Sequence, residues 1–295
     1  MVTPHQYCES LARAHYENFP VASYLLPAAM RPHVAAVYAF ARLADDIADE
    51  GGAPAAERLA ALDAWERRLM AVVAGDPDPG GAHPQVFAAV RETVRACDLP
   101  PSLLTDLLSA FKQDVVVSRY ATWASLLDYC RRSANPVGRL VLRIAGYRDA
   151  NLDRASDDVC TALQLTNFWQ DLEVDWRKGR VYVPADVSSA AGAREDDLAA
   201  GRLTPEWRAA LEECSRRTRA LFQSGRAVCD GLRGRLMWEL RATWLGGTRI
   251  LDKLERVQYD AVARRPTLGL SDALPIAFHA LTWHRASVPA RAAAN

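Results

Sequence analysis

Two segments of this chain combine an apolar body with a single narrow stripe of polar side chains. The first spans residues 33–50 and the second residues 159–175, and both have helical length. The polar residues recur at steps of three and four, which places them on one face of an α-helix. They are Tyr38, Arg42, Asp45 and Asp49 in the first segment, and Gln164, Asn167, Asp171 and Asp175 in the second. An ordinary surface helix has the opposite proportions, so the pattern predicts two mostly buried helices that face a polar cavity inside the protein.

The rest of the chain also favours helices. Half of the 295 residues are hydrophobic, which is enough for a sizeable core, and strand-like alternation is nearly absent. Helix starts are marked by Thr3-Pro4, Pro54, Pro101-Ser102 and Thr204-Pro205. Residues 76–84 contain three prolines and two glycines and are expected to form a loop. Because no low-complexity linker divides the chain, we expect an all-α fold with one domain over residues 1–295, frayed from about residue 286.

Composition excludes several classes of protein. Lys plus Arg and Asp plus Glu both number 36, so no net charge draws the whole surface to nucleic acid. No segment is apolar over the length of a membrane span, and the N-terminus lacks the features of a secretory signal. The six cysteines form no Cys-x-x-Cys pair and have no His at zinc-ligand spacing, as expected for reduced thiols in a cytoplasmic protein. Nucleotide-binding glycine motifs and the serine-hydrolase elbow are absent as well.

The two acidic stripes predict a metal and diphosphate site. Carboxylates four residues apart on a helix repel each other, and two such pairs on one interior face need a counter-charge. Mg²⁺ meets this need because it takes oxygen ligands, keeps several waters and binds substrate phosphates. We expect Asp45 and Asp49 to lie opposite Asp171 and Asp175, with Asn167 as a neutral oxygen ligand. A solvated acidic face is the usual interpretation of one such pair, but two pairs on apolar helices favour the metal site.

Basic residues accompany both stripes. Arg42 lies one turn before the first acidic pair, and Arg177, Lys178 and Arg180 follow the second. Arginine makes bidentate contacts with phosphate oxygens, so Arg42 and Arg180 are the expected diphosphate ligands. For Arg177 and Lys178, the sequence is equally consistent with ordinary cations at a helix C-terminus.

Residues 129–138, with the sequence YCRRSANPVG, supply small side chains and the helix-breaking Pro136. Ala134 and Gly138 permit close approach of a ligand or of another helix, and the sequence does not decide between the two. Candidates for the wall of an apolar tunnel are Phe111, Tyr120, Phe168 and Trp169, although core packing is the commoner role of each.

Together these segments resemble the squalene/phytoene synthase family of head-to-head prenyl synthases over residues 15–266. The acidic motifs read RLADDIADE from Arg42 and QLTNFWQDLEVD from Gln164, the second continuing into GRVYVP at residues 179–184. Residues 129–138 are similar to the family's tyrosine segment. The N-terminal substrate segment departs from the family's usual Ser-x-Ser-Phe form and reads HYENFPVAS over residues 15–23. This form, with SANPVG in the tyrosine segment, resembles the hydroxysqualene synthase branch of bacterial hopanoid biosynthesis.

The resemblance implies an isoprenoid-synthase helical bundle around a central cavity. In this branch one enzyme joins two farnesyl diphosphates into presqualene diphosphate, and a second, which this chain resembles, converts that intermediate into hydroxysqualene. A flavoprotein then reduces the alcohol to squalene. By resemblance, the substrate-binding residues are His15, Asn18, Phe19, Arg42, Ala134, Gly138, Gln164, Asn167, Arg180 and Tyr182. The Mg²⁺ ligands are Asp45, Asp49, Asn167, Asp171 and Asp175, and Tyr38 and Tyr129 orient the diphosphate or a water molecule.

The sequence leaves several points open. The same cavity would serve another head-to-head product, namely presqualene diphosphate, squalene made with NADPH, or a carotenoid precursor. A non-catalytic assembly subunit is a further alternative, which the two intact acidic motifs disfavour. The expected location is the cytoplasm. Peripheral contact with the inner membrane, functional coupling to a presqualene diphosphate synthase and to a flavoprotein reductase, and the oligomeric state are not decided.

Overall fold

The computed structural model describes residues 2–14, 26–49, 52–262 and 264–284. These residues form a succession of α-helices, and their one strand-like feature is an isolated parallel bridge between Arg119 and Val181. The helices are α1 (Pro4–Ala14), α2 (Arg31–Asp49), α3 (Ala55–Ala74), α4 (Pro84–Cys97), α5 (Ser102–Val116), α6 (Trp123–Ser133), α7 (Asn135–Ile144), α8 (Ala150–Gln170), α9 (Leu172–Arg177), α10 (Ala185–Ala190), α11 (Glu195–Ala199), α12 (Pro205–Gly225), α13 (Ala227–Gly231), α14 (Gly234–Arg256) and α15 (Leu270–Leu281). The all-α prediction is confirmed.

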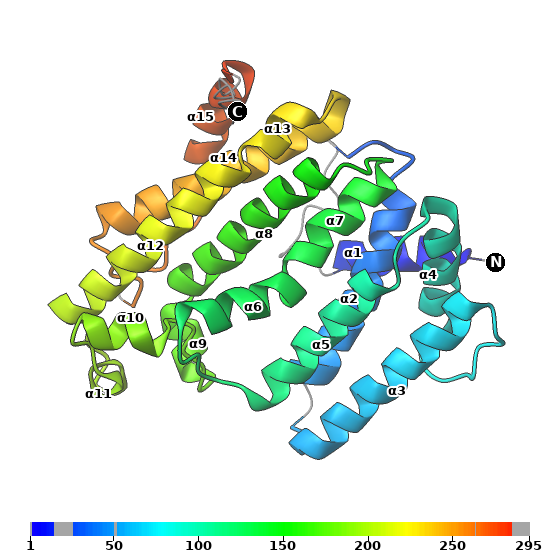
Figure 1. Ribbon diagram of the computed structural model, residues 1–295, viewed down its shortest axis with the longest axis horizontal. Helices are drawn as coiled ribbons and strands as arrows, with labels where there is room; N and C mark the ends of the chain where they lie inside the picture. Colours follow the sequence, from blue (N-terminus) through cyan, green and yellow to red (C-terminus); the bar gives the residue numbers. More distant parts are fainter. Residues whose placement is uncertain (1, 15–25, 50–51, 263, 285–295) are drawn as a thin grey trace, which may run out of the picture.

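Helix α8 lies in the middle of the bundle (Figure 1). It packs against α6 and α7 on one side and against α12, α13 and α14 on the other, while α2 packs against α1, α3, α4 and α5. Buried apolar side chains from α1 through α14 form one continuous core. The two helices that carry the acidic motifs are thus the central helices of the two halves of the bundle. In the part of the chain that the structure describes, no helix is both long and apolar enough to cross a membrane.

The two acidic helices differ in how closely they follow the prediction. The first, predicted over residues 33–50, is α2, whose buried face consists of Val, Ala and Phe side chains. The second was expected to be uninterrupted through residue 175, but α8 ends at Gln170 and α9 begins at Leu172. Asp171 between them has φ −103° and ψ 14°, while backbone hydrogen bonds from Asp171 to Asn167 and from Asp175 to Asp171 are both 2.8 Å. The prediction of a single helix is therefore wrong at Asp171, although i to i−4 hydrogen bonding continues across the interruption.

Glycines allow neighbouring helices to approach α8 closely. A Cβ on Gly138 of α7 would lie 2.3 Å from Ser156 Oγ and 2.6 Å from Cys160 Sγ. A Cβ on Gly225 of α12 would lie 2.6 Å from the carbonyl oxygen of Ala155. Close approach of a helix is therefore one reason for the small residue at position 138.

We expect Gly225→Ala to lower the free energy of unfolding by roughly 1–3 kcal/mol, the usual cost of overpacking. The added methyl group meets α8 backbone, which cannot rotate away as a side chain does. Gly269→Ala is the matched control, because nothing lies within 4 Å of its added Cβ and its backbone is extended. Chemical denaturation of both variants measures the difference, and equal stabilities would contradict the close packing of α12 on α8.

Candidate active site

Helix α2, the end of α5 and the segment after α9 line an open polar cleft. Its empty volume, including the opening to solvent, is about 1340 Å³. Both acidic and basic side chains gather there, namely Asp45, Asp46, Asp49, Asp114, Arg42, Arg58, Lys178 and Arg180. The first acidic motif therefore lies on a cavity wall, among cations from other parts of the chain.

A short turn after α9 brings Arg180 to this cleft. Gly179 has a φ of 77°, in the left-handed region that glycine adopts without strain. The next segment is pinned beside the end of α5, because the Val181 backbone N–H donates to the Ser118 carbonyl at 3.0 Å and Val181 bridges to Arg119. This local pairing turns Arg180 toward α2.

The Arg180 guanidinium joins α2 to α5. Its Nη2 lies 2.6 Å from Asp49 Oδ1, its Nη1 lies 3.3 Å from Asp49 Oδ2, and Nη2 also donates to the Asp114 carbonyl oxygen at 3.3 Å. Burial acts to raise the pKa of Asp49, but the hydrogen bond and charge of Arg180 outweigh it, so the pKa lies below its ordinary value. Asp49 is thus held as a carboxylate by a cation that follows the second acidic motif.

The negative charge of Asp45 is less fully neutralised by neighbouring cations than that of Asp49. Arg42 Nη2 lies 2.6 Å from Asp46 Oδ1, whereas Arg42 Nη1 is 3.6 Å from Asp45 Oδ2. Burial and the neighbouring Asp49 carboxylate raise the pKa of Asp45 to about 6. The first motif therefore contains a carboxylate whose negative charge is only partly neutralised by the protein.

Among the described residues, the second acidic motif likewise contains one carboxylate with a close cation and one without. Arg265 Nε lies 2.5 Å from Asp171 Oδ1, and its Nη2 lies 3.2 Å from Oδ2. Burial and the Asp171 carboxylate raise the pKa of Asp175 to about 7, and Asp175 also interacts with Asp49 and Arg180. The two motifs therefore share one electrostatic environment, with Arg180 close to both.

Asp114, at the end of α5, is a carboxylate that neither acidic motif contains. Its Oδ2 accepts a hydrogen bond from the Tyr129 hydroxyl at 2.8 Å, and its Oδ1 is buried with no hydrogen-bond partner among the described residues. Burial raises the pKa of Asp114 to about 7, and burial together with the nearby Asp114 raises the pKa of Tyr129. Tyr129 thus keeps its proton and points that proton at Asp114.

Packed aromatic rings hold Tyr129 in place. Tyr182 stacks on Phe168 with ring centroids 3.7 Å apart and planes 5° apart, and Tyr120 lies 5.5 Å from Tyr129. Trp169 is fully buried and donates to Thr218 at 2.9 Å. Tyr120, Phe168 and Trp169 therefore pack in the core rather than line either of the two apolar hollows described next.

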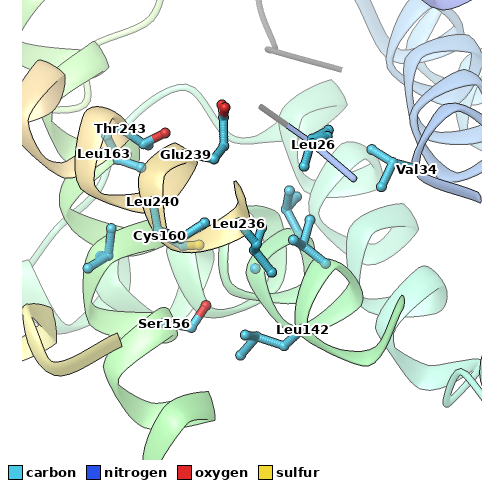
Figure 2. A pocket seen from close by; sticks show the side chains of 14 residues that line it. Leu26, Val34, Leu142, Ser156, Cys160, Leu163, Leu236, Glu239, Leu240 and Thr243 are labelled. Atoms are coloured by element: carbon cyan, nitrogen blue, oxygen red, sulfur yellow. The ribbon is translucent and has the colours of Figure 1, made fainter. Parts of the chain in front are cut away.

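The larger apolar hollow lies between α7, α8 and α14 (Figure 2). Its empty volume, including the opening to solvent, is about 740 Å³, and its wall is mainly Leu and Val, with Glu239 and Thr243 among the few polar residues. A second hollow, of about 470 Å³ measured in the same way, shares Val34, Val137 and Val141 with the first, and Tyr38 lines it. Tyr38 lies one turn of α2 before Arg42, so a single helix borders both the apolar space and the polar cleft.

Comparisons with known proteins identify the family of this chain. The family model for squalene/phytoene synthase matches residues 12–272. The chain belongs to the squalene/phytoene synthase family. A hydroxysqualene synthase from Zymomonas mobilis is 39% identical over 210 residues, which cover 70% of this chain and 68% of the relative. A phytoene synthase from Thermus thermophilus is 36% identical over 258 residues, which cover 87% and 85%.

A solved structure extends the match to three dimensions. The crystal structure of the squalene synthase HpnC from Alicyclobacillus acidocaldarius superposes with a TM-score of 0.80 at 40% identity, covering 87% of this chain and 94% of that one. The family and the helical fold that the motifs implied are both confirmed. The chain is accordingly an enzyme of a family that acts on prenyl diphosphates.

The other residues predicted to bind substrate do not all lie at the cleft or the hollows. Ala134 is buried at the junction of α6 and α7, and Gly138 lines the larger hollow. Gln164 is half-buried on α8 and Asn167 is exposed one turn later. Tyr182 belongs to the buried aromatic cluster. The predicted residues His15, Asn18 and Phe19 lie outside the described part of the chain.

The structure separates the two cations that the sequence left undecided. Arg177 pairs with Glu173 on α9 at 2.8 Å and does not line the cleft. Lys178 lines the cleft and acts electrostatically on Asp49 and Asp175. Lys178 therefore joins Arg42 and Arg180 as a cation of the site.

Arg265 and Asp114 were missed by the sequence analysis. The first is 94 residues from its partner Asp171 in the chain, and the second is 15 residues from Tyr129. A paired Arg264-Arg265 just before Pro266, and a lone acid that precedes three valines at residues 115–117, are the local signals available. Neither signal indicates which residue Arg265 or Asp114 contacts in the folded protein.

The donors of the two motifs suit Mg²⁺ in their chemistry. They are all oxygen, and the raised pKa values of Asp45 and Asp175 indicate negative charge that lacks a full counter-charge. Within the described ranges, no three His, Cys, Asp or Glu side chains converge closely enough to hold an ion by themselves.

Proposed function

We propose that this enzyme converts presqualene diphosphate into hydroxysqualene with release of diphosphate, in a reaction that requires Mg²⁺. One observation carries the proposal: α2 borders both a cleft of carboxylates and cations and an aliphatic space. A substrate with a diphosphate head and a C30 hydrocarbon body matches this division. The similarity to a hydroxysqualene synthase supports the choice of product.

The charged residues have separate tasks in this proposal. Arg42, Lys178 and Arg180 bind the diphosphate, since phosphate oxygens accept hydrogen bonds from such cations. Mg²⁺ would be held by Asp45, Asp49, Asn167, Asp171 and Asp175, and it supplies Lewis-acid charge neutralisation when bound. The salt bridge of Arg180 with Asp49 positions the guanidinium beside these ligands before substrate arrives.

The proposed reaction begins with cleavage of the carbon–oxygen bond, and the bonding electron pair leaves with the diphosphate. The cyclopropylcarbinyl cation rearranges to an allylic cation in the aliphatic hollow, whose wall is mainly Leu and Val. One water molecule then adds through its oxygen and gives up a proton, for which the released diphosphate is a nearby base. Tyr129, held by Asp114, and Tyr38, at the border of cleft and hollow, orient the diphosphate or that water.

The proposed reaction sets the enzyme between two others. A presqualene diphosphate synthase supplies the substrate, and a flavoprotein reductase consumes the alcohol. We further propose a cytoplasmic enzyme in peripheral contact with the inner membrane, because a C30 product leaves water for the bilayer.

The test is incubation of the purified protein with Mg²⁺ and either presqualene diphosphate or farnesyl diphosphate, followed by mass spectrometry. We expect only presqualene diphosphate to react, to give a C30 alcohol that carries heavy oxygen when the water is ¹⁸O-labelled. Chelation of the metal should stop the reaction. A hydrocarbon product, an unlabelled alcohol, or formation of presqualene diphosphate from farnesyl diphosphate would overturn the proposal.

The similarity to a phytoene synthase favours a second candidate, another head-to-head synthase that uses the same cavity. Added incubations with geranylgeranyl diphosphate, and with farnesyl diphosphate plus NADPH, test it directly. Formation of a C40 hydrocarbon in the first or squalene in the second would establish this candidate in place of the hydroxysqualene synthase.

A further inference from the structure

Helix α15 carries an exposed apolar stripe. Leu270, Leu274, Phe278 and Leu281 are between 61% and 94% exposed, and they share one helical face with the exposed Ala273 and Ala277. No polar residue interrupts that face. Figure 1 shows α15 at the edge of the bundle beside α14, away from α2 and α5. An uninterrupted apolar face of this kind marks an interaction surface.

The opposite face of α15 is anchored, which fixes the direction of the stripe. Asp272 is buried and accepts hydrogen bonds from Arg249 Nε at 3.0 Å and Lys253 Nζ at 2.5 Å, both on α14. At the other end, Trp283 Nε1 donates to Asp230 at 2.9 Å. The helix is thus fastened to the body through polar bonds, while the apolar side chains of the stripe point away from the core.

The Arg226 cation lies at the C-terminal end of α15. The Arg226 guanidinium lies 4.3 Å from the centre of a Trp283 ring, and Arg226 Nη2 donates to the His284 carbonyl at 2.6 Å. Residues 273–295 contain two arginines, Arg285 and Arg291, and neither Asp nor Glu. Cations beside an exposed apolar helix face are typical of helices that lie in the interface of an anionic membrane.

We propose that the stripe of α15 (Leu270, Ala273, Leu274, Ala277, Phe278 and Leu281) docks on the surface of an anionic lipid bilayer. This docking surface would be the site of the membrane contact that forms part of the proposed function. The biological purpose of the contact rests on the proposed function, whereas the docking itself does not. The charge of the flanking residues complements anionic lipid, and the helix is far too short to span a bilayer, so it lies in the plane of the interface.

A second copy of the chain is a poorer occupant of this surface. The 12 residues of α15 make a helix roughly 18 Å long and 10 Å wide, hence a footprint of roughly 200 Å². Stable protein interfaces bury roughly 800 Å² on each partner. The stripe alone is therefore too small to hold a dimer, whereas a bilayer surface has no minimum area to match.

The experiment is co-sedimentation of the full chain, without substrate, with vesicles of phosphatidylcholine and phosphatidylglycerol in equal parts. Leu274→Ser combined with Phe278→Ser should weaken binding roughly tenfold or more, because binding strength scales with the buried apolar area. The matched control is Val2→Ser combined with Met70→Ser, and it should bind like the wild type. Both residues are exposed and apolar, but Val2 precedes α1 and Met70 belongs to α3, and these helices lie apart from α15 (Figure 1). Binding to pure phosphatidylcholine vesicles should be weaker.

Three results would overturn the proposal. They are a wild-type protein that stays in the supernatant, a stripe variant that binds as tightly as the wild type, and a wild-type dimer in light scattering that the stripe substitutions convert to a monomer. Circular dichroism checks the helix content of each variant, and Leu270→Ser, at the most exposed position, is a milder second variant. Since no step uses substrate, failure here leaves the proposed activity untouched, and failure of the activity leaves vesicle binding intact.

Discussion

Asp45→Asn combined with Asp171→Asn is expected to lower kcat/KM for presqualene diphosphate by roughly 10³-fold or more. Each motif then loses one negatively charged oxygen ligand, while asparagine keeps the size of the side chain. Lewis-acid stabilisation of a leaving diphosphate is worth several kcal/mol, and about 1.4 kcal/mol corresponds to a tenfold change in rate. Steady-state release of diphosphate at saturating Mg²⁺ measures the effect.

The control for this double variant removes two negative charges from aspartates outside the site. Asp98→Asn combined with Asp196→Asn alters side chains that are 94% and 82% exposed, and wild-type turnover is expected. Because Asp171 is also the partner of Arg265, Asp45→Asn alone should be compared, since it disturbs no close salt bridge. Wild-type turnover by the double variant would show that the carboxylates do not hold a catalytic metal.

Arg180→Leu is expected to lower kcat/KM by roughly 10²- to 10³-fold, the range found when one group that stabilises transition-state charge is removed. The substitution deletes the cation between the two acidic motifs and leaves Asp49 without its 2.6 Å partner. Arg180→Lys should recover part of the loss, because it keeps the charge and gives up the bidentate geometry. The same diphosphate-release assay applies.

Arg177→Leu is the matched control, since it removes an arginine three residues earlier in the same segment. Its side chain is 77% exposed and, among the described residues, pairs only with Glu173 on its own helix. Activity should therefore stay within about twofold of the wild type, as for most exposed helix pairs. Equal losses in the two variants would mean that net positive charge near the cleft, rather than the position of Arg180, supports turnover.

The acidic stripe of α2 was predictable because it depends on one helix alone. Its polar residues recur at helical spacing, and the apolar residues between them are the ones that become buried. The interruption at Asp171 was not predictable, because neither proline nor glycine marks it. Nor did periodicity indicate that Phe168 and Trp169, on the same helix, would pack in the core instead of lining a tunnel.

The partners of the charged groups could not be found by spacing. Arg180 meets Asp49 across 131 residues, and Arg265 meets Asp171 across 94, so both contacts depend on how α2, α8 and the loops between them pack. Asp114 became a candidate only when α5 and α6 brought it to Tyr129. The exposed face of α15 could not be predicted either. The sequence shows that the helix is apolar, but the contact of Asp272 with Lys253 on α14 determines which way its apolar face points.

By itself, the sequence determined the helical class, the family and the identity of the carboxylates and arginines, because helix periodicity and motif spacing are local properties of a chain. Only the tertiary structure decided which cation compensates which carboxylate, that one helix borders both the polar cleft and the apolar space, and that an apolar stripe faces outward. Those features arise from contacts between residues that lie far apart in the chain, and such contacts exist only once the helices have packed.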